Sequence, residues 1–323
     1  MPALERPRSR YRMANQRATA VPERFAGKTT QRAFLMRVLL TGAAGQLGRC
    51  FIDRLPEGWV LMATDSQQLD ITDPSAVSRA VAEFKPDAVV NAAAYTAVDK
   101  AESEPERARA INADGPGFLA TAAAMLNIPF VHVSTDYVFD GTASEPYCEN
   151  TPCSPKSVYG QTKLDGEHAA LKANPKTVVI RTAWVFSEYG NNFVKTMLRV
   201  GAQRGELGVV SDQYGCPTYA GDIAAALVAM LSKPQVPCGI YHYCGDSAVS
   251  WFDFAQIIFE EAQACSLYPH QVKVNPIASH EYPTPASRPA YSILSTDKIC
   301  ALNLRPSPWK QQLKTVLRKV LSQ

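Results

Sequence analysis

Tyr159 and Lys163, a tyrosine and a lysine four residues apart, are well suited by type and spacing to acid–base chemistry. Side chains four residues apart lie one above the other on the same face of a helix. Thr135, at the end of an apolar run upstream, can bring a hydroxyl group beside them. Together the three side chains can hold a carbonyl oxygen, donate a proton to it and keep the proton donor acidic.

Tyr159 is the predicted proton donor of this group. An ordinary tyrosine has a pKa near 10, and we expect the ammonium group of Lys163 to lower the pKa of Tyr159. Lys163 can also hold the ribose hydroxyls of a nicotinamide cofactor, and Thr135 would donate a hydrogen bond to the carbonyl oxygen. The nearby His132 and His168 are expected to be structural or surface residues. The alternative interpretation of Tyr159 and Lys163 is an ordinary surface pair one helical turn apart.

A glycine-rich turn predicts a dinucleotide site, which would supply hydride. Residues 41–48 read TGAAGQLG, with the spacing G-x-x-G-x-x-G, directly after a predicted strand and before a predicted helix. Glycine permits a tight turn and the close approach of a pyrophosphate to backbone N–H groups. The residues predicted to contact the cofactor in this turn are Gly42, Gly45, Gln46, Leu47 and Gly48.

Asp65 ends the next predicted strand and is expected to face the adenosine ribose of the cofactor. A carboxylate there accepts hydrogen bonds from the ribose hydroxyls and repels a 2′-phosphate, so it favours NADH over NADPH. The other predicted cofactor contacts follow the second and third strands: Asp70, Ile71, Ala93, Ala94 and Tyr95.

Strand-like apolar runs alternate with helix-like segments as far as Trp184. The predicted strands are 34–40, 59–64, 87–94, 129–135 and 177–183, and the predicted helices are 46–55, 74–84, 105–126 and 157–172. This alternation predicts an α/β fold with a Rossmann-like, doubly wound parallel sheet. Ligands of such a sheet bind at the carboxyl ends of its strands, where Thr135 would lie.

The regular alternation weakens after Trp184. Helices are predicted at 192–203, 221–231, 251–265 and 308–321, with short strands at 208–210 and 240–243. We therefore expect residues 36–184 to form the dinucleotide-binding domain and residues 185–323 a smaller, C-terminal substrate-binding lobe that crosses back to the sheet. Trp184, Gln213 and Arg288 are predicted to face the substrate, and Arg288 would contact a phosphate.

Charge and composition argue against several classes of function. The net charge of the chain is +3, but residues 1–35 carry eight Arg or Lys and two Glu, so the remainder has a net charge of −3. Nucleic-acid binding by the folded part therefore has no electrostatic support. No apolar run approaches the roughly 20 residues that a membrane-spanning helix needs.

The cysteines and the N-terminal segment bear on the compartment. The eight cysteines include no C-x-x-C pair, so neither zinc nor a disulfide framework is supported, and a cytoplasmic location is expected. Residues 1–35 are Arg-rich and lack apolar periodicity, which predicts a disordered basic tail, with an organelle transit peptide as the alternative.

Eight segments carry a resemblance to a known family: TGAAGQLG, NAAAYTAVDKAESEP, VSTDYVFDGT, SVYGQTKLDGE, RTAWVF, NNFVKTML, SDQYGCPT and YPTPASRP. They resemble the extended short-chain dehydrogenase/reductases and, within these, the dTDP-4-dehydrorhamnose reductase family. The resemblance runs from Met36 to the C-terminus and implies NADH- or NADPH-dependent reduction of the C4 ketone of a nucleotide sugar, dTDP-4-dehydro-L-rhamnose. The product, dTDP-L-rhamnose, would be a precursor of cell-surface polysaccharide.

The resemblance also implies roles for particular residues. It implies that Thr135 and Tyr159 lie at the ketone, that Lys163 lies at the cofactor, and that Asp136 and Trp184 lie at the sugar.

Some positions depart from that family. Some of its members form homodimers through a magnesium ion held by glutamates, one of them on the first helix, where this chain has Cys50. The resemblance therefore implies a homodimer, while Cys50 argues against one that magnesium bridges. Tyr291 stands where an asparagine is expected, and Tyr95 stands where a histidine is common.

Two other functions remain open from the sequence. The first is a nucleotide-sugar epimerase or dehydratase with tightly bound NAD, which would share the Tyr–Lys pair. The second is a non-catalytic protein that resembles the regulatory subunit of methionine adenosyltransferase.

Overall fold

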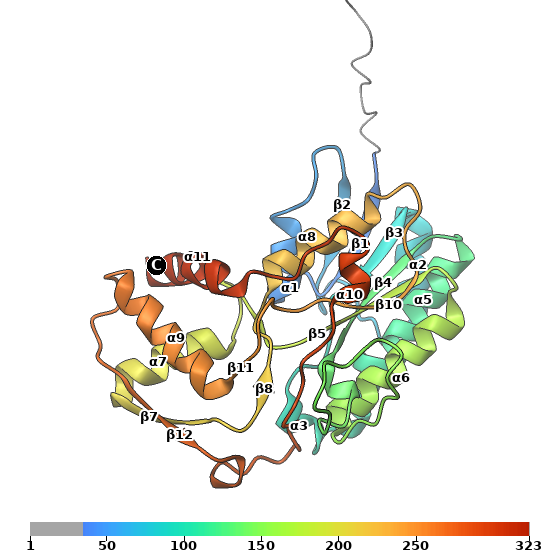
Figure 1. The fold of residues 1–323 in the computed structure, drawn as a ribbon. Coiled ribbons are helices and arrows are strands. Elements are labelled where there is room, and N and C mark those ends of the chain that lie inside the picture. The colour runs from blue at the N-terminus through green and yellow to red at the C-terminus, as the bar shows by residue number, and fades with distance from the viewer. Residues whose placement is uncertain (1–34, 323) are drawn as a thin grey trace, which may run out of the picture. The chain divides into compact units, whose positions relative to one another are not determined.

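Six parallel strands form the central sheet of this computed structural model, which describes residues 35–322 (Figure 1). Their spatial order is β10-β5-β4-β3-β1-β2, and every pairing between neighbours is parallel. Their bounds are β1 Arg37–Thr41, β2 Val60–Thr64, β3 Ala88–Asn91, β4 Phe130–Thr135, β5 Thr177–Thr182 and β10 Gly239–His242. The predicted parallel sheet is confirmed. The predicted basic tail, up to residue 34, lies outside the described residues.

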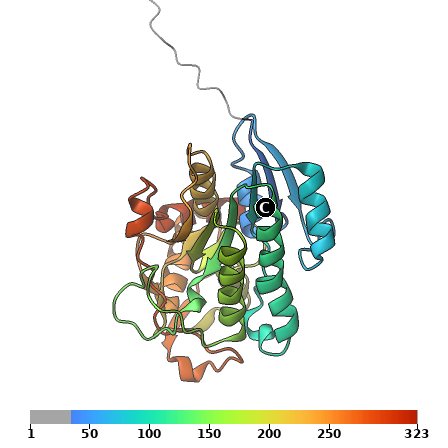
Figure 2. The same ribbon diagram turned by 90° about the vertical axis from the view of Figure 1, so that its right-hand side faces the viewer.

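Helices cover both faces of the sheet, as Figures 1 and 2 show. On one face, α1 (Gln46–Ile52) and α8 (Ala220–Leu231) pack on Val38 and Leu40 of β1. On the other face, α2 (Pro74–Phe84) and α5 (Gly115–Met125) pack on Leu39 of the same strand, and α6 (Val158–Ala173) lies beside α5. A strand buried on both faces explains the uninterrupted apolar run in its sequence.

The strand order places the ligand edge of the sheet. β1 lies between β2 and β3, so the chain proceeds from β1 first to one side of the sheet and then to the other. In open α/β sheets, ligands bind outside the carboxyl ends of the strands at such a reversal. The glycine-rich turn follows β1, and Thr135 ends β4 at the same edge.

The long helix predicted at 105–126 is interrupted by a π-helical turn. α4 (Pro105–Arg109) is followed by η1 (Ala110–Asp114) and then by α5. Pro116 has no N–H, so it cannot donate to the carbonyl of Asn112 as an α-helix requires. The Asn112 side chain bonds both the N–H and the C=O of Tyr95, at 2.8 and 3.1 Å. Gly166 of α6 packs directly on the Asn112 carbonyl, which leaves no room for a side chain.

A second hydrophobic core, around Phe254 and Trp309, lies in the C-terminal half. It is built from α7 (Phe193–Arg204), α9 (Trp251–Ala264) and α11 (Trp309–Leu321), with β7 (Glu206–Val210) paired to β12 (Lys273–Ile277). Figure 1 shows these elements grouped together, apart from α2, α5 and α6. The same half of the chain returns β10 and α8 to the central sheet.

The remaining elements are short. They are α3 Val98–Ala101, η2 Asp136–Val138, β6 Val185–Phe186, β8 Tyr214–Gly215, β9 Thr218–Tyr219, β11 Val249–Ser250, η3 Ser279–Glu281 and α10 Asp297–Cys300. None of the helices in residues 35–322 combines the length and the apolar character that crossing a membrane requires.

Candidate active site

The Tyr159–Lys163 pair lies on α6, whose first turn is capped by Ser157. The Ser157 hydroxyl accepts a hydrogen bond from the N–H of Gly160, at 3.1 Å, so the helix begins one residue later than predicted. At Gly160 the helix approaches the carbonyl of Tyr137 so closely that a Cβ atom would have no room. This approach brings Tyr159 into edge-on contact with the ring of Tyr137, with a centroid distance of 5.4 Å.

The pKa of Tyr159 is shifted opposite to the predicted direction. Burial raises the pKa, a hydrogen bond with Thr135 lowers it, and the nearby Asp136 and Tyr137 raise it further. Lys163 is not among the groups that shift the pKa of Tyr159, and its Nζ atom donates to the backbone oxygen of Val133 at 2.6 Å. The structure does bring Thr135 to Tyr159, as the sequence predicted.

Lys163 is almost fully buried, and burial lowers its pKa to about 8, although Glu167 one turn further along α6 opposes this shift. His132, which the sequence analysis set aside as structural or surface, is fully buried, and its Nε2 atom lies 3.5 Å from the Lys163 Nζ atom. A signal was present in the sequence, since His132 and Ser134 alternate onto one face of β4. Ser134 donates a hydrogen bond to Glu167, so this face of the strand meets α6.

Asp136 has one carboxylate oxygen that is hydrogen-bonded and one that is buried without a hydrogen-bond partner among residues 35–322. Its Oδ1 atom accepts a hydrogen bond from the Thr135 hydroxyl at 2.8 Å. Its Oδ2 atom has no hydrogen-bond partner within the described part of the chain. Burial raises the pKa of this carboxyl to about 6. Because an unsatisfied buried acceptor costs free energy, a hydroxyl group of a bound sugar would be a favourable partner for Oδ2.

The glycine-rich turn lies directly against the end of β3. Gly42 has a φ of +75°, and a Cβ atom there would lie 2.4 Å from the backbone nitrogen of Ala93. Asn91 connects the two segments, since its Oδ1 atom accepts hydrogen bonds from the Thr41 hydroxyl at 2.6 Å and from the Ala93 N–H at 3.1 Å. Two of the predicted cofactor contacts, Gly42 and Ala93, are thereby brought together.

An open pocket of about 360 Å³ follows this turn. It contains the predicted residue Asp65 and two residues that the sequence analysis missed, Arg49 and Tyr189. The Arg49 guanidinium lies 5.5 Å from the centroid of the Tyr189 ring, and a guanidinium matches the geometry of a phosphate. The position of Arg49, directly after Gly48, was the available signal. The lining residues are Ala43, Ala44, Arg49, Ile52, Asp53, Asp65, Gln68 and Tyr189.

Asp65 is the one predicted cofactor residue that lines this pocket, and three of the others have partners or packing that turn them elsewhere. Asp70 is exposed and accepts hydrogen bonds from Thr72, which fixes the local turn. Ile71 is buried in the core. The hydroxyl group of Tyr95 donates to Glu104 at 2.9 Å, so it faces the start of α4.

Trp184, a predicted substrate residue, lies at the start of the C-terminal half. It adopts a positive φ of 49°, and its ring stacks on Trp251 with a centroid distance of 3.4 Å and an angle of 7°. Gly215 makes room for the ring, because a Cβ atom there would lie 2.4 Å from it. The two stacked rings form one rigid apolar surface.

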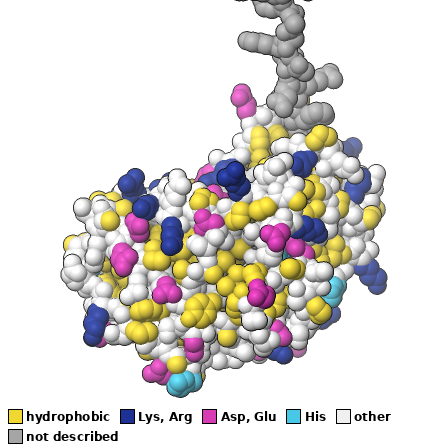
Figure 3. All heavy atoms as spheres, in the orientation of Figure 1, with side chains coloured by type: hydrophobic (Ala, Val, Ile, Leu, Met, Phe, Trp, Pro, Cys, Tyr) yellow, Lys and Arg dark blue, Asp and Glu magenta, His cyan; other side chains and the backbone are white. Residues whose placement is uncertain are grey.

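The other two predicted substrate residues are already bonded within the chain. Arg288 donates to Asp99 at 2.8 Å, which joins the C-terminal segment to α3. Burial raises the pKa of Tyr137 and the nearby Arg288 partly opposes that shift, so Arg288 lies beside the Tyr159 site. Gln213 is buried and donates to the hydroxyl group of Ser279 at 2.9 Å. On the face drawn in Figure 3, Lys and Arg side chains are scattered among hydrophobic and acidic side chains.

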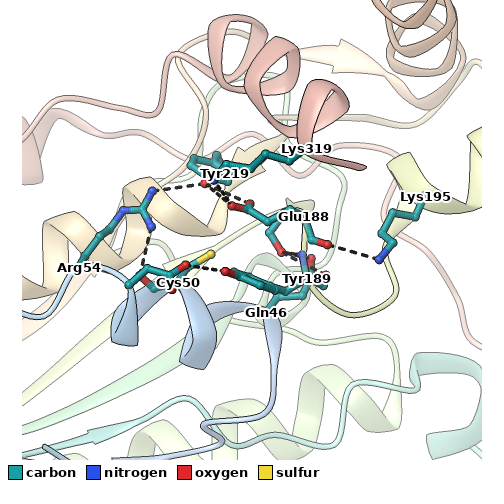
Figure 4. Close-up of polar contacts among 10 residues, drawn as sticks. Gln46, Cys50, Arg54, Glu188, Tyr189, Lys195, Tyr219 and Lys319 are labelled. Carbon is teal, nitrogen blue, oxygen red and sulfur yellow. Dashed lines mark hydrogen bonds and ion pairs between the residues drawn. The ribbon is translucent and has the colours of Figure 1, made fainter. Parts of the chain in front are cut away.

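The residues around Cys50 do not fit a magnesium ion. Burial, together with the nearby Glu188, raises the pKa of the Cys50 thiol to about 12, so it is not an anionic ligand. The Glu188 carboxylate is bonded to Lys319 and Tyr219 (Figure 4). Across residues 35–322, no three His, Cys, Asp or Glu side chains are grouped so that they could hold a metal ion.

Comparisons with known proteins agree on one family. The family model described as "RmlD substrate binding domain" matches residues 36–322. A dTDP-4-dehydrorhamnose reductase from Aggregatibacter actinomycetemcomitans is 46% identical over 289 residues, which cover 87% of this chain and 98% of that protein.

Solved structures agree with the sequence relatives. A dTDP-4-dehydrorhamnose reductase from Clostridium acetobutylicum has a TM-score of 0.83 and 42% identity, over 88% of this chain and 99% of the other. A dTDP-4-dehydrorhamnose reductase from Bacillus anthracis, in complex with NADP, has the same TM-score and coverage at 36% identity.

Proposed function

Because the chain belongs to the RmlD family of dTDP-4-dehydrorhamnose reductases, we propose that it reduces the C4 ketone of dTDP-4-dehydro-L-rhamnose to dTDP-L-rhamnose. The chain is an NAD(P)H-dependent oxidoreductase of the extended short-chain type, and its substrate is a nucleotide sugar. The observation that best supports this function is the contact of Tyr159 with Thr135, beside the unpaired buried oxygen of Asp136.

The side chains near the end of β4 have different roles towards the sugar. Tyr159 donates a proton to the oxygen atom that begins as the ketone. Thr135 donates a hydrogen bond to the same oxygen once its hydroxyl turns away from Asp136. Asp136 accepts a hydrogen bond from a sugar hydroxyl through Oδ2. The Trp184–Trp251 surface bounds the sugar on the side of the C-terminal half.

The cofactor residues fit a dinucleotide. Bound NADPH or NADH supplies the hydride. Gly42 has no side chain and Ala93 has only a methyl group, so no large side chain covers the backbone just after β1 and β3. Asp65 and Arg49 face the same pocket. The carboxylate of Asp65 suits the ribose hydroxyls, and the guanidinium of Arg49 suits a 2′-phosphate. Lys163, the lysine of the Tyr–Lys pair, holds the nicotinamide ribose.

The two other functions left open by the sequence are not favoured. The curated relatives between 40% and 46% identity that carry the reductase name cover nearly the whole chain from residue 36.

Three finer assignments accompany this proposal. Residues 185–323 act as the substrate-binding lobe, which the position of Trp184 and Arg288 supports. The homodimer that the family resemblance implies would not depend on magnesium, since the residues near Cys50 do not fit a metal ion. It works in the cytoplasm, in keeping with eight cysteines that are all unpaired.

A direct assay tests the proposal. Purified protein is mixed with NADPH or NADH and dTDP-4-dehydro-L-rhamnose, cofactor absorbance is followed, and the product is identified by mass spectrometry and NMR. Stoichiometric formation of dTDP-L-rhamnose is expected. Protein that retains bound NAD without exchange, or that oxidises no cofactor with any dTDP-4-dehydro sugar, would show that the assignment is wrong.

A further inference from the structure

Glu188 is a buried carboxylate whose cationic partner comes from the C-terminal helix. Its side chain is 4% exposed, and its Oε1 atom lies 2.5 Å from the Nζ atom of Lys319 on α11. The hydroxyl group of Tyr219 donates to the same carboxylate, at 3.1 and 3.3 Å (Figure 4). Lys319 itself is half-exposed, so the buried member of the pair is Glu188, and removal of Lys319 would leave that carboxylate without its cation.

The pair is charged in the folded protein. Burial raises the pKa of Glu188, but the hydrogen bond from Lys319, reinforced by Tyr219, lowers it below its ordinary value overall. Arg54 extends the network to α1, because it donates to the Tyr219 hydroxyl at 3.3 Å and to the Cys50 carbonyl at 3.1 Å. Figure 4 shows Arg54, Tyr219, Glu188 and Lys319 in one connected group.

The segment that carries Glu188 also contacts the dinucleotide-binding turn. Residues 187–192 form a loop, which we call the 187–192 loop after its bounds. The Ser187 hydroxyl and the Asn192 amide both donate to the side-chain oxygen of Gln46, each at 2.9 Å. The Tyr189 hydroxyl donates to Asp53 at 2.8 Å. The loop is therefore bonded to the first and last turns of α1.

The same loop forms part of the pocket assigned to the adenosine end of the cofactor. Tyr189 lines that pocket together with Arg49 and Asp65, and the Arg49 guanidinium lies over the Tyr189 ring. Cations over aromatic rings within about 6 Å are attracted to the ring face. A shift of the loop would therefore move a wall of the pocket and its cation together.

We propose that Lys319 is a positioning residue for the cofactor: its ion pair with Glu188 fixes the 187–192 loop on Gln46 and holds Tyr189 in the wall of the cofactor pocket. The inference rests on the proposed function for the identity of the pocket's ligand. It makes α11, at the far end of the sequence, part of the cofactor site.

A matched pair of variants on α11 tests this role. Lys319→Met removes the ion pair to Glu188, and Lys314→Met removes the ion pair of the same helix to Glu261, which does not touch the loop. The two lysines are exposed to similar degrees, at 51% and 53%. The dissociation constant of NADPH is measured by protein fluorescence without sugar, and KM for each substrate and kcat are measured in the full reaction.

Lys319→Met is expected to weaken NADPH binding about tenfold, as loss of one hydrogen bond to a charged group implies, with KM for the sugar and kcat within about twofold. Lys314→Met is expected to leave all constants unchanged, and Lys319→Arg to recover most of the affinity. Glu188→Gln, which keeps the side-chain volume, is the second variant should Lys319→Met fail to fold, and it is expected to weaken NADPH binding in the same way.

Equal NADPH affinities in wild type, Lys319→Met and Glu188→Gln would overturn the inference. So would a Lys314→Met protein that loses as much affinity as Lys319→Met, since the effect would then be general to the helix. Because NADPH binding is read without sugar, a wild-type protein that binds NADPH but reduces no dTDP-4-dehydro sugar contradicts the proposed function alone, and the ratio of the binding constants still decides the inference.

Discussion

The Nε2 atom of His132 lies 3.5 Å from the Nζ atom of Lys163, and the hydrogen bonds of His132 place a ring hydrogen between them. The Oδ1 atom of Asn91 accepts from Thr41 and from the Ala93 N–H, so its Nδ2 atom donates to Nδ1 of His132 at 3.1 Å. Burial and the charge of Lys163 keep the pKa of His132 well below its ordinary value. The neutral ring therefore carries its hydrogen on Nε2.

An N–H group that faces an amine favours the uncharged amine, in line with the lowered pKa of about 8 at Lys163. Asn91→Leu should free the ring to take the other tautomer, whose Nε2 atom accepts a hydrogen bond from the ammonium. The alkaline limb of the kcat–pH profile should then move upward by roughly one pH unit. Thr41→Val, which removes a different hydrogen bond of Asn91, is the control. An unmoved limb in Asn91→Leu would contradict the tautomer assignment.

Tyr159→Phe should bind NADPH normally and lose catalysis, because it removes the proton donor and keeps the ring that packs on Tyr137. Loss of a general acid lowers the rate on the order of 10²- to 10⁴-fold. The measurements are kcat, the dissociation constant of NADPH and the melting temperature. Near-normal turnover by a folded Tyr159→Phe protein would remove Tyr159 from the mechanism.

Asp136→Asn should abolish an acid limb in the pH profile of kcat/KM for the sugar. The wild-type limb is expected near pH 6, where the buried carboxyl of Asp136 takes up a proton and ceases to be a charged acceptor. The variant should be slower and show no inflection in that range. A wild-type profile that stays flat through pH 6 would show that Asp136 does not receive a substrate hydroxyl.

The same group also makes stability depend on pH. Its pKa is about 6 in the folded state against 3.8 in its unperturbed state, so between these values the folded protein binds more protons than the unfolded chain. The contribution of Asp136 to stability is therefore fully present below 3.8 and is lost as the pH rises through 6. As the pH rises from 3.8 to above 6, the melting temperature of wild type should therefore fall relative to that of Asp136→Asn.

Asp65→Ala and Arg49→Ala should shift cofactor preference in opposite directions. Both side chains face the pocket after the glycine-rich turn, and a carboxylate repels the 2′-phosphate of NADPH while a guanidinium binds it. The ratio of kcat/KM for NADPH to that for NADH should rise roughly tenfold in Asp65→Ala and fall by a similar factor in Arg49→Ala, as for one charged hydrogen bond. Ratios that stay constant would place the ribose elsewhere.

Chelation of metal ions should leave activity and oligomeric state unchanged. The Glu188 carboxylate is paired with Lys319, the raised pKa of Cys50 keeps its thiol protonated, and residues 35–322 contain no group of three His, Cys, Asp or Glu side chains that could hold a metal ion. Turnover and sedimentation velocity are compared in EDTA and in excess MgCl₂. Activity that disappears in EDTA and returns with magnesium would contradict the absence of a metal requirement.

The sequence by itself determined the local elements and the type of site. Apolar runs and turn residues specify strands and helices over short distances, so the strands of the parallel sheet, the turn around Gly42 and the helical spacing of Tyr159 and Lys163 were all predictable. The π-turn at Ala110–Asp114 was not, because it depends on how Asn112 meets Tyr95 and Gly166 in space.

The tertiary structure alone decided which charged and polar groups are partners. Glu188 and Lys319 are 131 residues apart, and Asp99 and Arg288 are 189 apart. Side chains that distant in the chain meet through the packing of whole elements, which no local spacing encodes. The same packing places the Nζ atom of Lys163 against the backbone oxygen of Val133 and the ring of His132. A buried group takes whatever partner the fold supplies, because an unpaired one is costly, so its pKa is set by that partner and by its burial.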